Sequence, residues 1–215
     1  GGLLVDVARQ YIPLAALERT VDAMAFSAKM NVLHLHITDD QSFPLEVPGF
    51  PTLSERGAFA HGATYSAEAL ADFASYCHDR GVRLLLEVDT PSHSTSFVKS
   101  GLNISTICGD GDGADGLLAL LDPTKDLTYE VLGAVFAQMH RLLPRHGEQL
   151  LHVGGDEVEQ SCWERNPAVA KWMTARGIRN GTELWRLFTT RMMEAVAKHA
   201  PHRTPVVWEV SRYMW

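Results

Sequence analysis

Residues 82–93 read VRLLLEVDTPSH, an apolar run that ends abruptly in polar and charged side chains. The run from Val82 to Val88 has the length and the composition of a buried β-strand. Gly81 precedes it, at a place where glycine commonly ends a helix. Asp89 and His93 follow it directly. The segment therefore predicts a helix, then a buried strand, then a polar loop.

The same pattern recurs along the rest of the chain. Four further strands are expected over residues 3–7, 31–37, 149–153 and 205–208. Between the strands, apolar residues recur at helical period over residues 14–28, 67–80, 128–143, 168–175 and 182–198. Strands that alternate with helices favour a parallel sheet with right-handed crossover connections.

The positions of the polar residues distinguish two α/β architectures. Polar or charged side chains follow all five expected strands: Asp6 and Arg9, Asp39 and Asp40, Asp89 and His93, Asp156 and Glu157, and Glu209. A barrel delivers functional groups from every strand end, whereas an open doubly wound sheet concentrates them at one switch point. We therefore predict a (β/α)8 TIM barrel. A complete barrel typically needs about 250 residues, so we expect this one to be truncated after about five βα units.

Composition excludes some classes of partner. Of the 215 residues, 46% are hydrophobic and 21% are charged, with a formal net charge of −7. Because no basic stripe is present to neutralise phosphates, we expect no nucleic-acid partner. No run of about twenty apolar residues is present, so we expect no membrane span. A neutral polar substrate such as a sugar is compatible with this composition.

The segment HVGGDE at residues 152–157 is the centre of the functional argument. Its two glycines permit a tight turn and a close backbone approach to a ligand. Asp156 and Glu157 are adjacent, so on extended backbone their side chains point in different directions. An Asp-Glu pair is usually a solvated acidic turn. At the mouth of a buried strand, two carboxylates in unlike environments suit glycoside cleavage, because one can donate a proton while the other stays ionised.

Other polar residues near the expected strand ends each have two interpretations. Asp89 and His93 can form a pair that tunes a third group, or His93 can simply pack in a loop. Arg9 can bind sugar hydroxyls through its fork of donors, or form a surface ion pair. Trp208 can be a wall for a sugar ring or a core residue.

His34 and His36, with Asp39 nearby, raise the question of a metal site. Alternation along a strand places both histidines on one face, as metal ligands require. Two inward histidines in a buried strand can equally be packed and hydrogen-bonded, and we favour that interpretation. We expect no metal and no other cofactor.

Five segments together resemble a known family: GLLVDVARQY (2–11), NVLHLHITDDQSFPLEV (31–47), LLLEVDTPSHS (84–94), LLHVGGDEVEQSCWERNP (150–167) and VVWE (206–209). Their sequence and order resemble the family 20 glycoside hydrolases, in particular the eukaryotic lysosomal β-N-acetylhexosaminidases. The resemblance covers essentially the whole chain. It implies that residues 1–215 are part of a catalytic (β/α)8 barrel, with an N-terminal α/β domain and the C-terminal barrel strands absent.

The resemblance also implies roles for individual residues. Glu157 would be the general acid/base, and Asp156 would orient the 2-acetamido group of the substrate while its carbonyl oxygen attacks the anomeric carbon. Arg9 would bind hydroxyls at the non-reducing end, and Trp208 would line the acetamido pocket. The remaining implied site residues are Asp39 in substrate binding and Asp89, His93 and His152 in a supporting network. Gln10 and Ser92 depart from the family pattern, where His and Gly are more usual.

The same resemblance implies a disulfide between Cys108 and Cys162, whereas Cys77 on an apolar helix face is expected to be a buried free thiol. It implies an exo-hydrolase of glycans with terminal β-linked GlcNAc or GalNAc, retaining and substrate-assisted, in a lysosomal or secreted protein. The sequons at Asn103 and Asn180 are compatible with a secreted glycoprotein. The sequence does not decide whether the full-length protein is a dimer. The alternative function is a non-catalytic sugar-binding remnant or a truncated inactive product.

Overall fold

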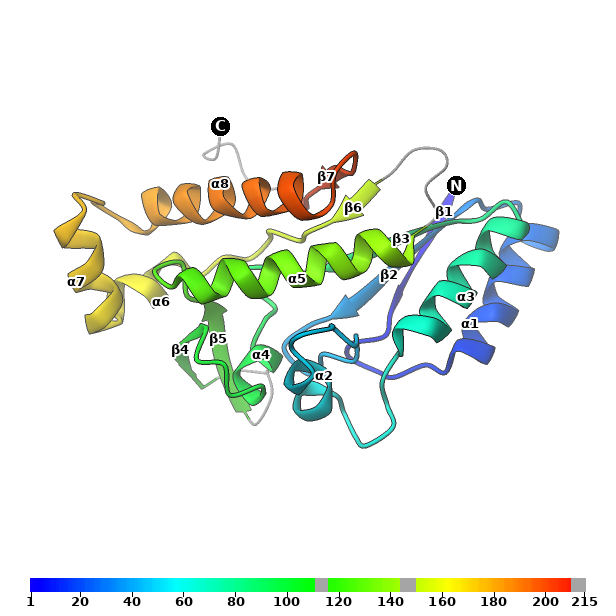
Figure 1. The fold of residues 1–215 in the computed structure, drawn as a ribbon, viewed down its shortest axis with the longest axis horizontal. Helices are drawn as coiled ribbons and strands as arrows, with labels where there is room; N and C mark the ends of the chain where they lie inside the picture. Colours follow the sequence, from blue (N-terminus) through cyan, green and yellow to red (C-terminus); the bar gives the residue numbers. More distant parts are fainter. Residues whose placement is uncertain (111–115, 144–149, 210–215) are drawn as a thin grey trace.

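The computed structural model describes residues 1–110, 116–143 and 150–209. Within them the chain forms a five-stranded parallel sheet in the order β1-β2-β3-β6-β7 (Figure 1). The strand bounds are β1 Gly2–Asp6, β2 Val32–Thr38, β3 Arg83–Val88, β6 Leu150–His152 and β7 Thr204–Val206. All five expected strands are present. The Gln149 end of the expected fourth strand lies outside the described residues.

The strand order is sequential, without the reversal that defines a doubly wound sheet. Consecutive helices that follow the strands contact one another in the order α1, α3, α5, α8, and they form a layer beside the sheet (Figure 1). Their bounds are α1 Leu14–Asp22, α3 Ala67–Asp79, α5 Asp126–Leu142 and α8 Gly181–His199. Because the strands are parallel and neighbours, their carboxyl ends all lie at one edge of the sheet.

The expected helix over residues 14–28 has two parts. After α1 the chain continues as a π-helix, η1, over Ala23–Ala28, and Lys29 ends it in the left-handed conformation at φ 55°. Leu17, Val21 and Met24 are buried, so the predicted apolar stripe forms the core as far as Met24. In α3, Ser66 caps the first turn by accepting a hydrogen bond from the Ala69 amide, as its position predicted.

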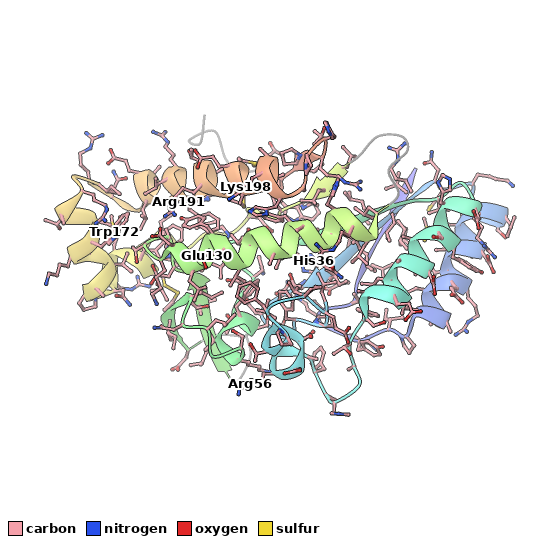
Figure 2. All side chains as sticks on the ribbon, viewed as in Figure 1. His36, Arg56, Glu130, Trp172, Arg191 and Lys198 are labelled. Carbon is pink, nitrogen blue, oxygen red and sulfur yellow. A yellow bond between two sulfur atoms is a disulfide. The ribbon has the colours of Figure 1, made fainter. Side chains whose placement is uncertain are left out.

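Helices α5 and α8 pack along most of their lengths and are joined at their exposed edge by charged side chains. Arg191 of α8 donates to Asp126 of α5 at 2.7 Å and lies over the Tyr129 ring at 3.7 Å. Figure 2 shows Arg191 and Glu130 on these two neighbouring helices. The Arg191–Asp126 ion pair joins α8, the last helix of the described chain, to α5.

The connection from β3 to α5 contains structure that the sequence analysis did not predict. It includes a short helix, α4 Ser96–Lys99, and an antiparallel pair, β4 Ser105–Asp110 with β5 Leu117–Leu121. Two more short helices that were not predicted lie elsewhere in connections, α2 Thr52–Gly57 and α6 Gln160–Arg165, whereas α7 Pro167–Ala175 confirms the helix expected over residues 168–175. The β4–β5 pair matters for the site because Leu118 and Leu120 help to line its cleft.

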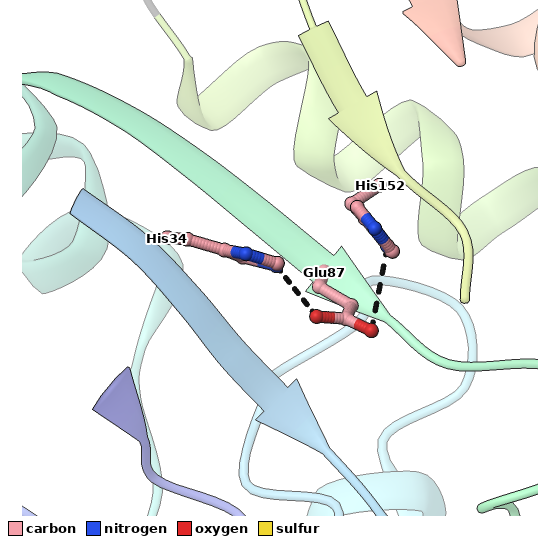
Figure 3. Close-up of side chains that lie close together, drawn as sticks. All are labelled: His34, Glu87 and His152. Atoms are coloured by element: carbon pink, nitrogen blue, oxygen red, sulfur yellow. Dashed lines mark ion pairs between the residues drawn. The ribbon is translucent and has the colours of Figure 1, made fainter. Parts of the chain in front are cut away.

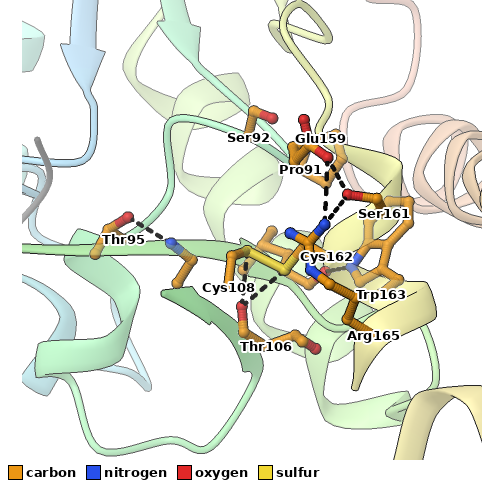
Figure 4. The surroundings of a disulfide bond; sticks show 12 residues. Pro91, Ser92, Thr95, Thr106, Cys108, Glu159, Ser161, Cys162, Trp163 and Arg165 are labelled. Atoms are coloured by element: carbon orange, nitrogen blue, oxygen red, sulfur yellow. Dashed lines mark hydrogen bonds and ion pairs between the residues drawn. A yellow bond between two sulfur atoms is a disulfide. The ribbon is translucent and has the colours of Figure 1, made fainter. Parts of the chain in front are cut away.

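A disulfide joins Cys108 of β4 to Cys162 of α6, as the resemblance implied (Figure 4). Trp163, fully buried beside it, donates its indole N–H to the Leu121 carbonyl at 3.0 Å. The bridge therefore fastens the β4–β5 pair to the segment that follows Asp156 and Glu157. Cys77 is a buried free cysteine, as predicted.

Replacing both Cys108 and Cys162 with alanine is expected to destabilise the protein. The cysteines are 54 residues apart, so the loop-entropy model gives a loss of about 4 kcal/mol in the free energy of unfolding. Urea denaturation of the oxidised wild type, the reduced wild type and the double variant measures it. The reduced wild type should resemble the double variant. Equal stability of all three would contradict a structural role for the bridge.

Candidate active site

The carboxyl ends of the strands bring four of the predicted site residues, Arg9, Asp39, His93 and Glu157, to one cleft. The cleft has a volume of about 450 Å³. Its lining residues come from the loops after β1, β2, β3 and β6 and from β5: Arg9, Asp39, Asp40, Gln41, Ser92, His93, Leu118, Leu120, Glu157 and Glu159. Arg9 and Glu157 thus belong to the same cavity although they are far apart in the sequence.

Arg9 is oriented by two carboxylates. Its Nη1 lies 2.6 Å from Asp6 Oδ2 and its Nη2 lies 2.8 Å from Asp39 Oδ2. Asp6 also accepts the Ala8 and Arg9 amides, which fixes the turn after β1. The Arg9 side chain is still 48% exposed, so part of its guanidinium faces the cleft. The forked N–H donors of a guanidinium held in this way can bind sugar hydroxyls.

Asp39 is a fully buried carboxylate that several donors keep ionised. His36 Nε2 lies 2.6 Å from its Oδ2, and the Asp40 amide donates to its Oδ1 at 2.6 Å. Burial alone would raise the pKa of Asp39, but the interactions with His36 and His93 outweigh it, and the pKa lies well below its usual range. Asp39 therefore provides a fixed negative charge beneath the cleft.

His93 connects Asp39 to the two adjacent acids. Its Nδ1 lies 3.4 Å from Asp39 Oδ1, and its Nε2 lies 3.3 Å from Glu157 Oε2 and 3.8 Å from Asp156 Oδ2. The interaction with Asp39 raises the pKa of His93 to about 9, although burial opposes it. At neutral pH His93 is thus a cation placed between these acids.

Asp156 and Glu157 have different surroundings. The Glu157 side chain is 77% exposed, while that of Asp156 is 32% exposed. Glu157 has a positive φ of 51°, and Ser92 Oγ donates to its carbonyl oxygen at 3.0 Å. Both carboxylates lie near His93 Nε2, but they differ in exposure. The pair therefore has one acid open to the cleft and one acid partly enclosed.

Asp89 supports Asp156 from the protein side. It is buried, and its Oδ1 accepts the Gly155 amide at 3.0 Å. Burial, followed by the negative charge of Asp156, raises the pKa of Asp89 well above its usual value. The protonated form of Asp89 is thus favoured more strongly than it is for an exposed aspartate.

Because Gly154 has no side chain, Asp89 can lie close to the backbone after β6. Its φ is +73°, and a Cβ atom there would lie 1.6 Å from Asp89 Oδ1 and 2.6 Å from Asp89 Cα. We expect Gly154→Ala to lower the free energy of unfolding by about 2–4 kcal/mol, because strain at positive φ adds to overpacking. Urea denaturation measures the loss.

Gly177→Ala is the matched control for that substitution. Gly177 has a similar φ of +69°, but nothing lies within 4 Å of its added Cβ. The control isolates backbone strain, so about 1 kcal/mol is expected. Equal losses for the two variants would show that the close contact at Asp89 carries no energy.

Trp208 and His152 lie beneath the strand ends. Trp208 follows β7, where its amide donates to the Gly154 carbonyl at 3.0 Å. Its ring contacts those of His34 and His152, with centroids 5.6 and 4.8 Å away, and its side chain is only partly buried. Burial lowers the pKa of His152 to about 4, so His152 is neutral. Trp208 therefore packs on the buried network while keeping part of its ring accessible.

The sequence analysis missed Glu87, which is completely buried in β3. It accepts the Trp208 indole N–H at 2.7 Å and contacts His34, His36 and His152. A charged residue inside the apolar run VRLLLEV was the available signal, because a buried carboxylate requires donors. The alternation argument did place His34 and His36 on one face, and both contact Glu87 from there.

The metal hypothesis for His34, His36 and Asp39 does not match this geometry. His34 is directed to Glu87, and the Asp39 oxygen nearest His36 already lies 2.8 Å from the cationic Arg9. His36 lies between Asp39 and Glu87, and His34 Nε2 lies close to Glu87 and not to Asp39.

None of the helices within the described residues is long and apolar enough to cross a bilayer.

Comparisons with known proteins show which family the chain belongs to. Residues 1–212 match the model of the glycosyl hydrolase family 20 catalytic domain. The chain is 35% identical to human beta-hexosaminidase subunit beta and 34% identical to Arabidopsis thaliana beta-hexosaminidase 1. Each match covers 97% of this chain and 36% of the relative. The chain thus spans about a third of the length of these relatives.

Solved structures resemble the whole chain. A Flavobacterium johnsoniae chitobiase matches with a TM-score of 0.82 and 28% identity, covering 100% of this chain and 32% of its own. A beta-N-acetylhexosaminidase crystal structure matches with a TM-score of 0.82 and 29% identity, and the match covers 97% of this chain and 46% of the chain in that structure.

Proposed function

Because the chain belongs to glycosyl hydrolase family 20, we propose that it is part of a β-N-acetylhexosaminidase that removes terminal, non-reducing β-linked GlcNAc or GalNAc from glycans. The observation that carries the proposal is the pair of adjacent acids after β6, with Glu157 open on the cleft and Asp156 partly enclosed beside Asp89 and His93. Arg9, from the first strand end, lines the same cavity as Glu157.

In the proposed reaction Glu157 protonates the glycosidic oxygen as the leaving group departs. The acetamido carbonyl oxygen of the substrate attacks the anomeric carbon, and Asp156 accepts a hydrogen bond from the acetamido N–H while charge develops on that group. Water then opens the oxazolinium-like intermediate, with Glu157 acting as base. This is the substrate-assisted variant of a retaining mechanism.

The supporting residues fit this division of work. The raised pKa of Asp89 favours its neutral form, which reduces the repulsion between Asp89 and Asp156. The His93 cation contacts both acids and Asp39. Arg9 is oriented by Asp6 and Asp39, and its exposed donors suit the hydroxyls of the terminal sugar. Trp208 would border the acetamido group.

We also propose that the five strands are an arc of a (β/α)8 barrel. The sequential strand order and the single layer of helices support this. Residues 1–215 would then be part of a catalytic domain, truncated after about five βα units, with the N-terminal α/β domain and the remaining strands outside these residues. The hexosaminidase relatives favour a lysosomal or secreted location for the protein.

A comparison of three substrates tests the proposed function in the full-length protein. We expect hydrolysis of the 4-nitrophenyl β-glycoside of N-acetylglucosamine. The corresponding α-glycoside and the 4-nitrophenyl β-glucoside, which lacks the acetamido group, should be hydrolysed far more slowly. Comparable rates on the β-glucoside would exclude participation of the acetamido group, and no hydrolysis of any substrate would exclude the activity.

A further inference from the structure

Glu87 belongs to a polar row that crosses the sheet just below the cleft. The strand register aligns Asp6 with His36, His36 with Glu87, and Glu87 with His152. Residues aligned across parallel strands project to the same face. The row therefore runs from the first strand to the fourth, one layer beneath the loops that carry Arg9, Asp39 and Asp156.

Four side chains from three segments converge on the Glu87 carboxylate. Its Oε2 lies 2.5 Å from His34 Nε2 and 3.1 Å from His36 Nδ1. Its Oε1 accepts the Trp208 indole N–H at 2.7 Å and lies 3.3 Å from His152 Nδ1. Figure 3 shows Glu87 between His34 of β2 and His152 of β6. A carboxylate with no solvent exposure is costly unless it is paired, and both Glu87 oxygens have donors or cations beside them.

On one side Glu87 is linked to the residues that orient Arg9. His36 bridges two carboxylates, since its Nδ1 faces Glu87 and its Nε2 lies 2.6 Å from Asp39 Oδ2. That same Asp39 oxygen lies 2.8 Å from Arg9 Nη2. Although burial opposes it, the two carboxylates raise the pKa of His36 to about 10. The series of contacts from Glu87 through His36 and Asp39 to Arg9 therefore alternates in charge between the buried row and the cleft.

On the other side Glu87 fixes Trp208. The indole N–H has a carboxylate acceptor, and the ring packs on His34 and His152, which themselves contact Glu87. Losing the Glu87 charge would thus release the tryptophan ring and weaken the support of Asp39 at the same time.

We propose that Glu87 is a positioning residue for the reaction, which holds the Asp39–Arg9 pair and the Trp208 indole in their working orientations from beneath the cleft. The inference rests on the proposed function, because those are the groups assigned there to binding the terminal sugar and its acetamido group.

A metal ion held by His34, Glu87 and His152 is the competing interpretation of this cluster. Two ligand atoms on one zinc ion, each about 2.0–2.1 Å from it in tetrahedral geometry, lie about 3.3 Å apart. His34 Nε2 and Glu87 Oε2 are only 2.5 Å apart, which is a direct contact. The Trp208 N–H also occupies Oε1. The geometry is that of an ion-paired network.

The test uses Glu87→Gln and Glu87→Asp in the full-length protein, with 4-nitrophenyl N-acetyl-β-D-glucosaminide as substrate. The glutamine keeps the volume but removes the charge and replaces one acceptor with a donor. A misplacement of about 1 Å at a reacting site costs about 10²-fold in rate, so we expect kcat/KM of Glu87→Gln to fall about 10²-fold, with most of the loss in kcat. Glu87→Asp keeps the charge and both acceptors, and should recover about ten-fold of that loss.

Asp122→Asn is the matched control for a buried carboxylate outside the site. Asp122 is 5% exposed and accepts from the Thr124 amide and hydroxyl at 2.9 and 2.6 Å. This variant should lose thermal stability as Glu87→Gln does but keep its kcat. The comparison separates positioning from a general loss of folded protein.

Each result decides the inference. A folded Glu87→Gln variant with wild-type kcat/KM would overturn it. If Glu87→Gln does not fold, a folded Glu87→Asp variant with wild-type kcat/KM overturns it, and a clear loss of kcat supports it. If the wild type itself is inactive, the proposed function has failed. Calorimetry with N-acetylglucosamine then replaces the rate: weaker binding by the Glu87 variants supports positioning, and unchanged binding excludes it.

Discussion

Replacing Glu157 with glutamine in the full-length protein is expected to lower kcat/KM for 4-nitrophenyl N-acetyl-β-D-glucosaminide by about 10²–10⁴-fold, the usual contribution of a positioned general acid or base. Glu157 is the open carboxylate on the cleft, and its Oε2 contacts His93 at 3.3 Å. The amide cannot donate a proton to the leaving oxygen. Because the shape of the side chain is kept, KM should change much less than kcat.

The leaving group identifies the role of Glu157. A 2,4-dinitrophenyl leaving group needs little protonation, so the loss in the first step should be much smaller with it than with an alkyl or sugar leaving group. Glu159→Gln is the control: Glu159 lines the same cleft, but Ser161 and Arg165 hold its carboxylate (Figure 4). Its effect should be less than about ten-fold. Equal losses for Glu157→Gln with every leaving group would contradict the assignment of the acid.

Replacing Asp156 with asparagine is expected to lower kcat by about 10²–10³-fold, as the loss of one preorganised electrostatic contact to a developing charge does. The amide keeps the size of the side chain but removes the negative charge beside the acetamido nitrogen. It also removes a charge that raises the pKa of Asp89, so that pKa should fall. The kinetic loss is measured on the same substrates as for Glu157→Gln.

The two acids should differ in one decisive respect. The Asp156→Asn loss should be about the same for good and poor leaving groups whenever the first step limits the rate, because Asp156 acts on the nucleophile and not on the departing oxygen. A leaving-group dependence like that of Glu157→Gln would mean that both acids act on proton transfer, and the proposed division of roles would be wrong.

The sequence predicted the parts of the fold that depend on local pattern. Each apolar run followed by polar residues became a strand with its functional groups at one edge, and Ser66 and Gly81 bounded α3 as expected. The β4–β5 pair was missed because glycines and aspartates dominate the residues between its strands, and such composition indicates a loop. Leu117–Leu121 pairs with β4 across a short connection, but this short apolar run was not identified as a strand.

The site residues likewise include some that local pattern indicates and one whose partners depend on tertiary structure. Asp156 and Glu157 could be chosen from the sequence because a glycine pair and a strand end stand beside them. Glu87 was marked in the sequence only as a charge inside an apolar run, and its partners depend on register: it lies level with His36 on one neighbouring strand and with His152 on the other. Register between parallel strands joined by long crossovers is set by packing of the whole sheet, and the single sequence does not contain it.

The central claim is that the acetamido group of the substrate is the nucleophile, restrained by Asp156 while Glu157 transfers the proton. Its most direct test is the rate of the wild-type protein on a series of 4-nitrophenyl β-glucosaminides whose N-acyl group carries zero, one, two or three fluorine atoms. Fluorine withdraws electrons from the carbonyl oxygen, so the account predicts that kcat/KM falls at every step of the series. A kcat/KM that stays constant across the four substrates would contradict it.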